Sequence, residues 1–265
     1  MEEKKEEKKK RIPPFYQPPH EKSTINHVVA IMSGKGGVGK SMVTALSALA
    51  VQRAGWNVGI MDADITGPSI PTAFGVKGPL QMKDGTALAA ESASGIQMVS
   101  TNLLLPKETD PVIWKGPMVG SAVKQFWSDF IWNNLDYLFI DMPPGTGDVP
   151  LTVFQTLPVE GIVIVTSPQE LVSMIVEKAI NMARMMGVPV LGVIENMSYF
   201  EAPDTGVRYS IFGESHVEEV CEKYGLKVLA KLPLNPEMAK LVDEGRVEEV
   251  DTSAFSQVVE SILTL

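Results

Sequence analysis

The chain has 265 residues, 45% of them hydrophobic and 21% charged, which is the composition of an ordinary globular protein with a large core. Its one cysteine, Cys221, excludes an internal disulfide and a cysteine-based metal site within one chain. The net charge of −9 argues against nucleic-acid binding by bulk positive charge. No apolar run reaches the ~18 residues of a membrane helix, and MEEKKEEKKK lacks the apolar stretch of a signal peptide. We therefore expect a cytoplasmic protein without a membrane or nucleic-acid partner.

The first 23 residues differ in composition from the rest of the chain. Residues 1–11 carry six basic and four acidic side chains, and residues 12–19 contain four prolines. Proline removes amide donors and favours extended backbone, and such a segment buries too little apolar surface to order itself. We predict a disordered, charged and proline-rich tail over 1–23. Docking of Phe15 and Tyr16 on a partner or on the rest of the chain is the alternative.

From residue 24 onward, short apolar runs alternate with longer helical patterns. The runs are continuous, as in strands buried on both faces of a sheet, and they cover 28–32, 58–61, 96–100, 137–141, 161–166, 190–194 and 228–232. The predicted helices cover 40–54, 117–133, 169–186, 214–224, 236–244 and 252–264. The alternation predicts an α/β fold with a parallel β-sheet and helices on both faces, in a single domain over 24–265. The long connection from 62 to 95 is expected to be functional.

The first predicted strand runs directly into a glycine-rich loop. The loop reads Gly34-Lys35-Gly36-Gly37-Val38-Gly39-Lys40-Ser41, which fits the phosphate-binding pattern G-x-x-x-x-G-K-[ST]. Glycines let the backbone fold around phosphate, and the following helix adds its N-terminal partial charge. We expect this loop and Met42 to bind ATP, with Lys40 at the β- and γ-phosphates and the Ser41 hydroxyl on Mg²⁺. The alternative is a glycine-rich turn without a ligand.

Carboxylates end two of the predicted strands. Asp62 and Asp64 follow the second strand, and Asp141 follows four apolar residues of the fourth strand. The carboxyl ends of parallel strands form the edge where ligands bind. We expect Asp141 to hold Mg²⁺ through water, and one of Asp62 and Asp64 to support the metal while the other orients the attacking water. The alternative for Asp62 and Asp64 is a helix-capping or turn role.

Two further segments follow predicted strands. Pro143–Asp148 reads PPGTGD, in which the Gly145 N–H can sense a γ-phosphate from a stiff, hinged loop. Asn196 ends the sixth strand and can bind the edge of adenine or serve as a turn residue. The segment that contains Pro233 is expected to form the other wall of the base pocket.

The loop GKGGVGKS, with Lys35 directly after its first glycine, resembles the deviant Walker A loop of the MinD/ParA/nitrogenase-iron-protein group of P-loop ATPases. The resemblance implies a homodimer with two ATP molecules between the subunits, in which Lys35 reaches the partner's nucleotide. It also implies that Asp64 is the aspartate tied to hydrolysis, that Asp62 supports the metal, and that Asn196 contacts adenine.

Seven segments narrow the resemblance to the Mrp/ApbC family of cytoplasmic ATPases, which carry iron–sulphur clusters to apo-proteins. They are IMSGKGGVGKS, DADITGPSIP, VIWKGPM, DMPPGTGD, SPQEL, ENMSYF and IFGE, in the family's order over about residues 26–250. The resemblance implies a Mg²⁺-dependent dimeric ATPase, slow without a partner, that acts in iron–sulphur cluster assembly or transfer.

The chain departs from the family pattern where the cluster binds. The family usually reads M-S-Y-F-x-C-P-x-C-G, and two subunits pool their cysteine pairs, but Ala202 and Thr205 stand here in place of the cysteines. Neither residue supplies the thiolate that holds an iron–sulphur cluster. Cys221 shares a helical face with Val217 and Tyr224, which predicts a core residue. The sequence thus argues against direct cluster binding and suggests a CxxC-bearing homologue or an iron–sulphur apo-protein as partner.

Two other functions stay open. One is a MinD/ParA-like interaction switch without iron–sulphur cargo. A membrane-bound switch of this kind would need a basic amphipathic C-terminal helix. Residues 251–265 have no Lys or Arg. They carry instead an apolar stripe that is typical of a helix docked on the core: Phe255, Val258, Val259 and Ile262. The other is a nucleotide-binding regulator that hydrolyses too slowly to count as an enzyme.

Overall fold

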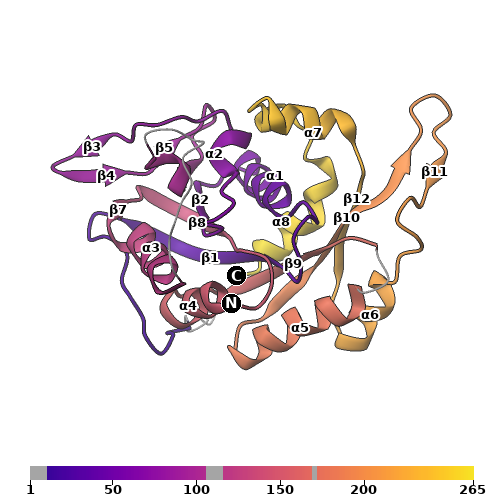
Figure 1. Ribbon diagram of the computed structural model, residues 1–265, viewed down its shortest axis with the longest axis horizontal. Coiled ribbons are helices and arrows are strands. Elements are labelled where there is room, and N and C mark those ends of the chain that lie inside the picture. The colour runs from indigo at the N-terminus through magenta and orange to yellow at the C-terminus, as the bar shows by residue number, and fades with distance from the viewer. Residues whose placement is uncertain (1–10, 106–115, 169–171) are drawn as a thin grey trace, which may run out of the picture.

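The computed structural model describes residues 11–105, 116–168 and 172–265 of the chain. Trp114, Lys115 and residues 169–171, which belong to two of the segments typical of the Mrp/ApbC family, lie outside this part. Figure 1 shows a large twisted sheet between two groups of helices.

Nine strands of the described residues form the large sheet, in the order β11-β10-β9-β1-β8-β2-β6-β5, with β12 also paired to β10. They are β1 (Thr24–Ser33), β2 (Val58–Asp62), β5 (Ala90–Glu91), β6 (Gln97–Val99), β8 (Asn134–Asp141), β9 (Gly161–Thr166), β10 (Val190–Glu201), β11 (Arg208–Tyr209) and β12 (Val228–Pro233). Only β5 and β11 pair antiparallel within this sheet as described. The predicted α/β fold with a mostly parallel sheet is confirmed.

Helices cover both faces of this sheet. One face carries α1 (Lys40–Arg53), α2 (Ile70–Ala73), α7 (Pro236–Asp243) and α8 (Ser256–Ile262), with the short 3₁₀ helices η1 (Thr101–Leu103), η2 (Val247–Glu249) and η3 (Ser253–Phe255). The other face carries α3 (Gly116–Ser128), α4 (Asp148–Thr156), α5 (Val172–Met185) and α6 (Val217–Tyr224). Neighbouring residues of β1 enter opposite cores, Val29 and Ile31 on one side and Ala30 and Met32 on the other, because side chains alternate along a strand. This is why the buried strands read as continuous apolar runs.

The sequence did not predict the short elements of the 62–95 connection. This stretch holds α2, β3 (Met82–Lys83), β4 (Thr86–Leu88) and β5, and β3 and β4 form a small separate sheet with β7 (Phe130–Ile131). Elements of two to four residues are too short to show a hydrophobic period. Helix α4 was also not predicted from the sequence. Its Pro150 is compatible with a helix because it lies in the first turn, where a missing N–H costs no helical hydrogen bond.

The N-terminal segment from Arg11 onward packs on the sheet's helices. The N–H groups of Phe15 and Gln17 donate to carbonyl groups at the end of α4, and the Trp127 indole of α3 donates to the Gln17 carbonyl. This placement differs from the solvated tail expected for residues 11–23. The side chains of Phe15 and Tyr16 remain 67% and 46% exposed, so the backbone makes these contacts, and composition does not reveal them.

The C-terminal helix is docked, as its apolar stripe predicts. Phe255, Val258 and Ile262 are buried, and Val259 packs against the same core. Among the described residues, no helix combines the length and the apolarity needed to cross a membrane.

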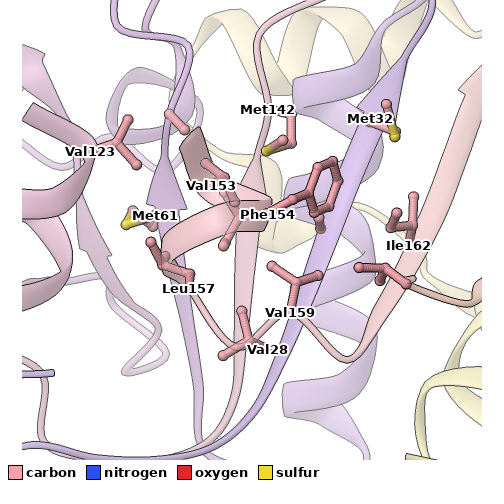
Figure 2. Packing of buried hydrophobic residues seen from close by; sticks show 14 of the residues in the cluster. Val28, Met32, Met61, Val123, Met142, Val153, Phe154, Leu157, Val159 and Ile162 are labelled. Carbon is pink, nitrogen blue, oxygen red and sulfur yellow. The ribbon is translucent and has the colours of Figure 1, made fainter. Parts of the chain in front are cut away.

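The core beneath α4 offers a test of this packing. Figure 2 shows Phe154 of α4 among Met32, Met142 and Val159, and Phe154 is fully buried. We expect Phe154→Ala to lower the free energy of unfolding by about 3–5 kcal/mol, because the substitution removes buried area and leaves a cavity. Urea denaturation measures the loss. Met185→Ala is the control, since Met185 is 80% exposed, and equal midpoints for the two variants would contradict this account of the core.

Candidate functional site

The glycine-rich loop between β1 and α1 surrounds a cavity of about 240 Å³. Gly37 and Gly39 have φ angles of 81° and 75°, a left-handed conformation that favours glycine. Gly39 precedes α1 and provides no side-chain cap, so N–H groups at the start of α1 remain available to an anion. The cavity is lined by Ser33, Lys35, Gly36, Gly37, Val38, Gly39, Lys40, Ser41, Met42, Asp64 and Pro144. The structure thus brings together the predicted phosphate-binding residues, except that Gly34 is not part of this lining.

A buried ion pair joins this loop to the end of β8. Lys40 Nζ lies 2.7 Å from Asp141 Oδ1, and the two side chains are 6% and 0% exposed. The Ser41 hydroxyl donates to Asp141 Oδ2 at 2.6 Å, and the Thr44 hydroxyl donates to Asp141 Oδ1 at 2.6 Å. The Asp141 carboxylate is therefore fully satisfied, as a buried charge must be.

Asp62 lies beside this pair, at the end of β2. Its carboxylate is fully buried and accepts hydrogen bonds from the N–H groups of Asp64, Ser69 and Ile70 and from the Ser100 hydroxyl. Burial, and next the negative charge of Asp141, raise the pKa of Asp62 to about 7. Asp62 therefore fixes the loop that leads from β2 to α2.

The oxygen atoms around Asp141 fit a magnesium ion. Ser41 Oγ and the carboxylates of Asp62 and Asp141 are hard ligands of the kind that Mg²⁺ prefers. A divalent cation would also offset burial and the repulsion by Asp141, which in this order raise the pKa of Asp62. Ser41 and Asp141 could therefore hold Mg²⁺, with Asp62 behind them.

Asp64 is the one carboxylate among the described residues that line the cavity. It is half-buried, and burial raises the pKa of its side chain, while the nearby positive charge of Lys40 opposes this shift. The two predicted aspartates thus differ in place, since Asp62 holds the loop and Asp64 faces the cavity.

The segment after Asp141 closes on the glycine-rich loop. The Gly145 N–H donates to the Ser33 carbonyl at 2.8 Å, and Pro144 lies 3.9 Å from the point that a Cβ on Gly36 would occupy. Gly145 has a φ of 86°. The N–H would have to leave Ser33 before it could bind a γ-phosphate, so its role as a sensor stays a prediction.

Asn196 lies under the glycine-rich loop. Its side chain is fully buried, its Nδ2 donates to the Val38 carbonyl at 2.9 Å, and its Oδ1 has no partner among the described residues. A Cβ on Gly39 would lie 2.3 Å from this Nδ2, which explains a second requirement for glycine there. Pro233 ends the neighbouring strand β12. Neither residue lines the cavity, and their adenine contacts stay predictions.

Ala202 and Thr205 lie in the turn between β10 and β11. This hairpin projects from the body of the molecule in Figure 1. Cys221 is 2% exposed on α6, as predicted, and burial raises the pKa of its thiol to about 11. Within residues 11–105, 116–168 and 172–265, no group of three or more His, Cys, Asp or Glu side chains could hold a metal ion.

Two hydroxyl residues of the site were missed at the level of sequence. Thr44 follows Lys40 by one helical turn, and this spacing could have placed it beside the lysine. Ser100 follows β6 and reaches Asp62 only because β6 and β2 are neighbours in the sheet. No local signal marks such a contact.

Comparison with known proteins places this site in a family. The chain matches the family described as "ParA: NUBPL iron-transfer P-loop NTPase" over residues 24–264. The chain belongs to this family. The resemblance to the Mrp/ApbC carriers is thereby confirmed.

The relatives of this P-loop NTPase include proteins named "Iron-sulfur cluster carrier protein". That of Aquifex aeolicus is 45% identical over 222 residues, which are 83% of this chain and 61% of the relative. That of Clostridium perfringens is 42% identical over 250 residues, 90% of this chain and 87% of the relative. The chain therefore spans only about three-fifths of the length of the first of these.

Solved structures agree with this assignment. The nucleotide-binding protein of Archaeoglobus fulgidus, in complex with ADP, is 43% identical with a TM-score of 0.79, covering 88% of this chain and 91% of that one. MinD of Aquifex aeolicus, solved in the MinC:MinD complex, is 20% identical with a TM-score of 0.61, covering 90% and 94%. The second likeness shows a shared fold.

The buried ion pair of this NTPase gives a stability prediction. We expect Lys40→Met to lower the free energy of unfolding by about 3–5 kcal/mol without nucleotide and with a chelator present, because Asp141 loses its buried cation. Urea unfolding measures the change. Lys22→Met is the matched control, since Lys22 pairs with Asp84 at the surface, where ion pairs contribute little. A Lys40→Met midpoint equal to that of the control would refute the structural role of the pair.

Proposed function

We propose that this P-loop NTPase binds and hydrolyses Mg–ATP as a homodimer and acts in iron–sulphur cluster assembly or transfer without holding a cluster itself. The observation that carries the proposal is the Lys40–Asp141–Ser41 network, which adjoins a cavity that Asp64 faces. The cytoplasmic location expected from the sequence belongs to the same proposal.

The loop residues and Asp64 divide the chemistry between them. The N–H groups of Gly36–Met42 bind the phosphates, and Lys40 turns from Asp141 to the β- and γ-phosphates. Ser41, Asp141 and Asp62 would provide the oxygen ligands of Mg²⁺ or hold its waters, and the ion would supply positive charge to the phosphates when bound. Asp64 orients the attacking water toward the γ-phosphate.

The dimer completes the site in this proposal. Lys35 lines the cavity and reaches the nucleotide of the partner subunit. The Gly145 N–H exchanges the Ser33 carbonyl for a γ-phosphate oxygen, which couples the nucleotide state to the following helix α4. Asn196 and Pro233 contribute to the adenine pocket once the buried amide of Asn196 turns outward.

The proposed iron–sulphur role rests on similarity to the carrier proteins. The hairpin itself has no thiolates, because Ala202 and Thr205 stand in place of the two cysteines. The partner we propose is a CxxC-bearing homologue or an iron–sulphur apo-protein. The same two residues and the MinD-like fold favour a second candidate, an ATP-dependent interaction switch without iron–sulphur cargo. A pull-down with and without ATP separates the two, since only the first retains iron–sulphur proteins.

Hydrolysis gives the first test of the proposal. We expect Mg²⁺-dependent phosphate release by the native chain and a kcat at least about 100-fold lower for Asp64→Asn, because the water loses its positioning group. Steady-state phosphate release measures both. Asp84→Asn is the matched control, since Asp84 is an exposed carboxylate outside the cavity. Equal release by all three proteins would eliminate Asp64 as a catalytic residue.

The same Asp64→Asn protein reports on the dimer. With Mg–ATP it should sediment as a dimer, because the nucleotide that bridges the subunits persists. Adding Lys35→Ala should return it to a monomer. A dimer that forms without nucleotide and ignores Lys35 would contradict the proposed arrangement.

Cluster binding gives the second test. After anaerobic reconstitution, we expect the native chain to hold no stoichiometric iron and sulphide, because the dimer has no thiolate in the hairpin turns. The double variant Ala202→Cys and Thr205→Cys should gain a cluster shared by two subunits. Iron and sulphide analysis and the visible absorption spectrum measure both. A stoichiometric cluster in the native chain would overturn this part of the proposal.

A further inference from the structure

The end of helix α4 is capped by a distant part of the chain. A helix leaves its last four carbonyl groups without partners inside the helix. In α4, the Val153 carbonyl accepts from the following Leu157 N–H at 2.8 Å. The other three carbonyls accept from the N-terminal segment: Phe154 from Arg11 Nη2 (2.7 Å), Gln155 from the Phe15 N–H (2.9 Å), and Thr156 from the Gln17 N–H (3.0 Å). We call residues 11–17 the N-terminal strap.

The strap is itself fixed to the domain. The Gln17 carbonyl accepts from the Trp127 indole of α3 at 2.8 Å, and Trp127 is 1% exposed. Pro13 is buried, and the Tyr16 N–H closes a turn onto the Pro13 carbonyl. The positive charge of Arg11 also lies at the helix end where the macrodipole is negative. The strap therefore links the ends of α3 and α4.

The opposite end of α4 begins at the nucleotide site. Gly147 is its N-terminal flanking residue and provides no side-chain cap, and Gly145, two residues earlier, donates to the Ser33 carbonyl of the glycine-rich loop. The helix has nine residues, so it spans about 13 Å between the loop and the strap. An isolated helix of this length is marginal in water and depends on its packing and its caps.

We propose that the N-terminal strap positions the Gly145 loop for ATP hydrolysis by holding the far end of α4. The groups that act are the Arg11 guanidinium and the N–H groups of Phe15 and Gln17, which are positioning groups because none of them touches nucleotide. The inference rests on the proposed hydrolysis and on the proposed contact of Gly145 with the γ-phosphate. Without the strap, three carbonyl groups of α4 lose their partners and the helix frays. The Gly145 loop then samples many positions, of which few are competent for hydrolysis.

The proposal separates turnover from binding. The cavity is lined by residues 33–42, Asp64 and Pro144, while the hydrogen bonds described for the strap go to α3, to α4 and within itself. Loss of the strap should therefore lower kcat and leave the KM for ATP and the affinity for ADP in place. A role limited to global stability would also leave KM in place, but it would lower kcat only in proportion to the folded fraction, so each kcat is divided by the folded fraction measured by circular dichroism.

The test compares two shortened chains in Mg²⁺-dependent phosphate release. A chain that starts at Arg11 should keep the native kcat, whereas a chain that starts at Pro18 should lose about tenfold in kcat, with KM within about twofold. Arg11→Ala should lose part of this rate, and Arg11→Lys should restore it, because lysine keeps a donor and the charge. Ile12→Ala is the matched control, since Ile12 is 80% exposed beside Arg11.

Three outcomes overturn the proposal. They are a native kcat for the chain that starts at Pro18, a fall in kcat that is fully accounted for by the loss of folded fraction, and equal rates for Arg11→Ala and Arg11→Lys when both are low. Hydrogen exchange gives a reading independent of hydrolysis, since removal of the strap should speed exchange of the amides from Gly145 to Gln155. If the native chain releases no phosphate, the proposed function fails, and unchanged exchange in α4 would then refute the strap as well.

Discussion

The contact between the Lys40 ammonium and the Asp141 carboxylate is the interaction on which the rest of the site depends. It joins the loop after β1 to the end of β8, and these strands are direct neighbours in the sheet. Removing both charges from water is costly, and their attraction offsets that cost only when the remaining hydrogen-bonding capacity is filled. The Ser41 and Thr44 hydroxyls fill it at 2.6 Å each. The pair therefore fixes the start of α1, and with it the glycine-rich loop, against the end of β8.

The order of the strands places a second buried carboxylate, that of Asp62, beside the Lys40–Asp141 pair. The parallel register aligns Asp62 of β2 with Asp141 of β8. Two buried carboxylates therefore lie side by side at the ends of neighbouring strands. Burial, and next the negative charge of Asp141, raise the pKa of Asp62 to about 7. Local conflict of this kind is typical of functional sites, where the missing compensation is brought by a ligand. The burial of two carboxylates at neighbouring strand ends is thus the feature that favours a cation here.

The sequence predicts those parts of this molecule that depend on side chains in local patterns. Strands buried on both faces read as continuous apolar runs. The motifs around Lys40 and Asp141 predict the position of the candidate phosphate-binding site. The contacts that failed to be predicted are made by the backbone or across the sheet. The strap binds α4 through N–H groups of Phe15 and Gln17, which every residue except proline carries, so composition suggested a solvated tail. Asn196 was expected at adenine, and only the folded chain shows its amide on the Val38 carbonyl.

Backbone hydrogen bonds close the hairpin that carries Ala202 and Thr205. The Ala202 N–H donates to the Val207 carbonyl, and the Gly206 N–H returns to the Ala202 carbonyl. At the base of the hairpin, the buried Glu195 accepts from Ser198 and Ser215, and its neighbour Asn196 contacts the glycine-rich loop. The neighbouring residues Glu195 and Asn196 of β10 therefore connect the base of the hairpin to the glycine-rich loop through side-chain hydrogen bonds, independently of the residues at positions 202 and 205.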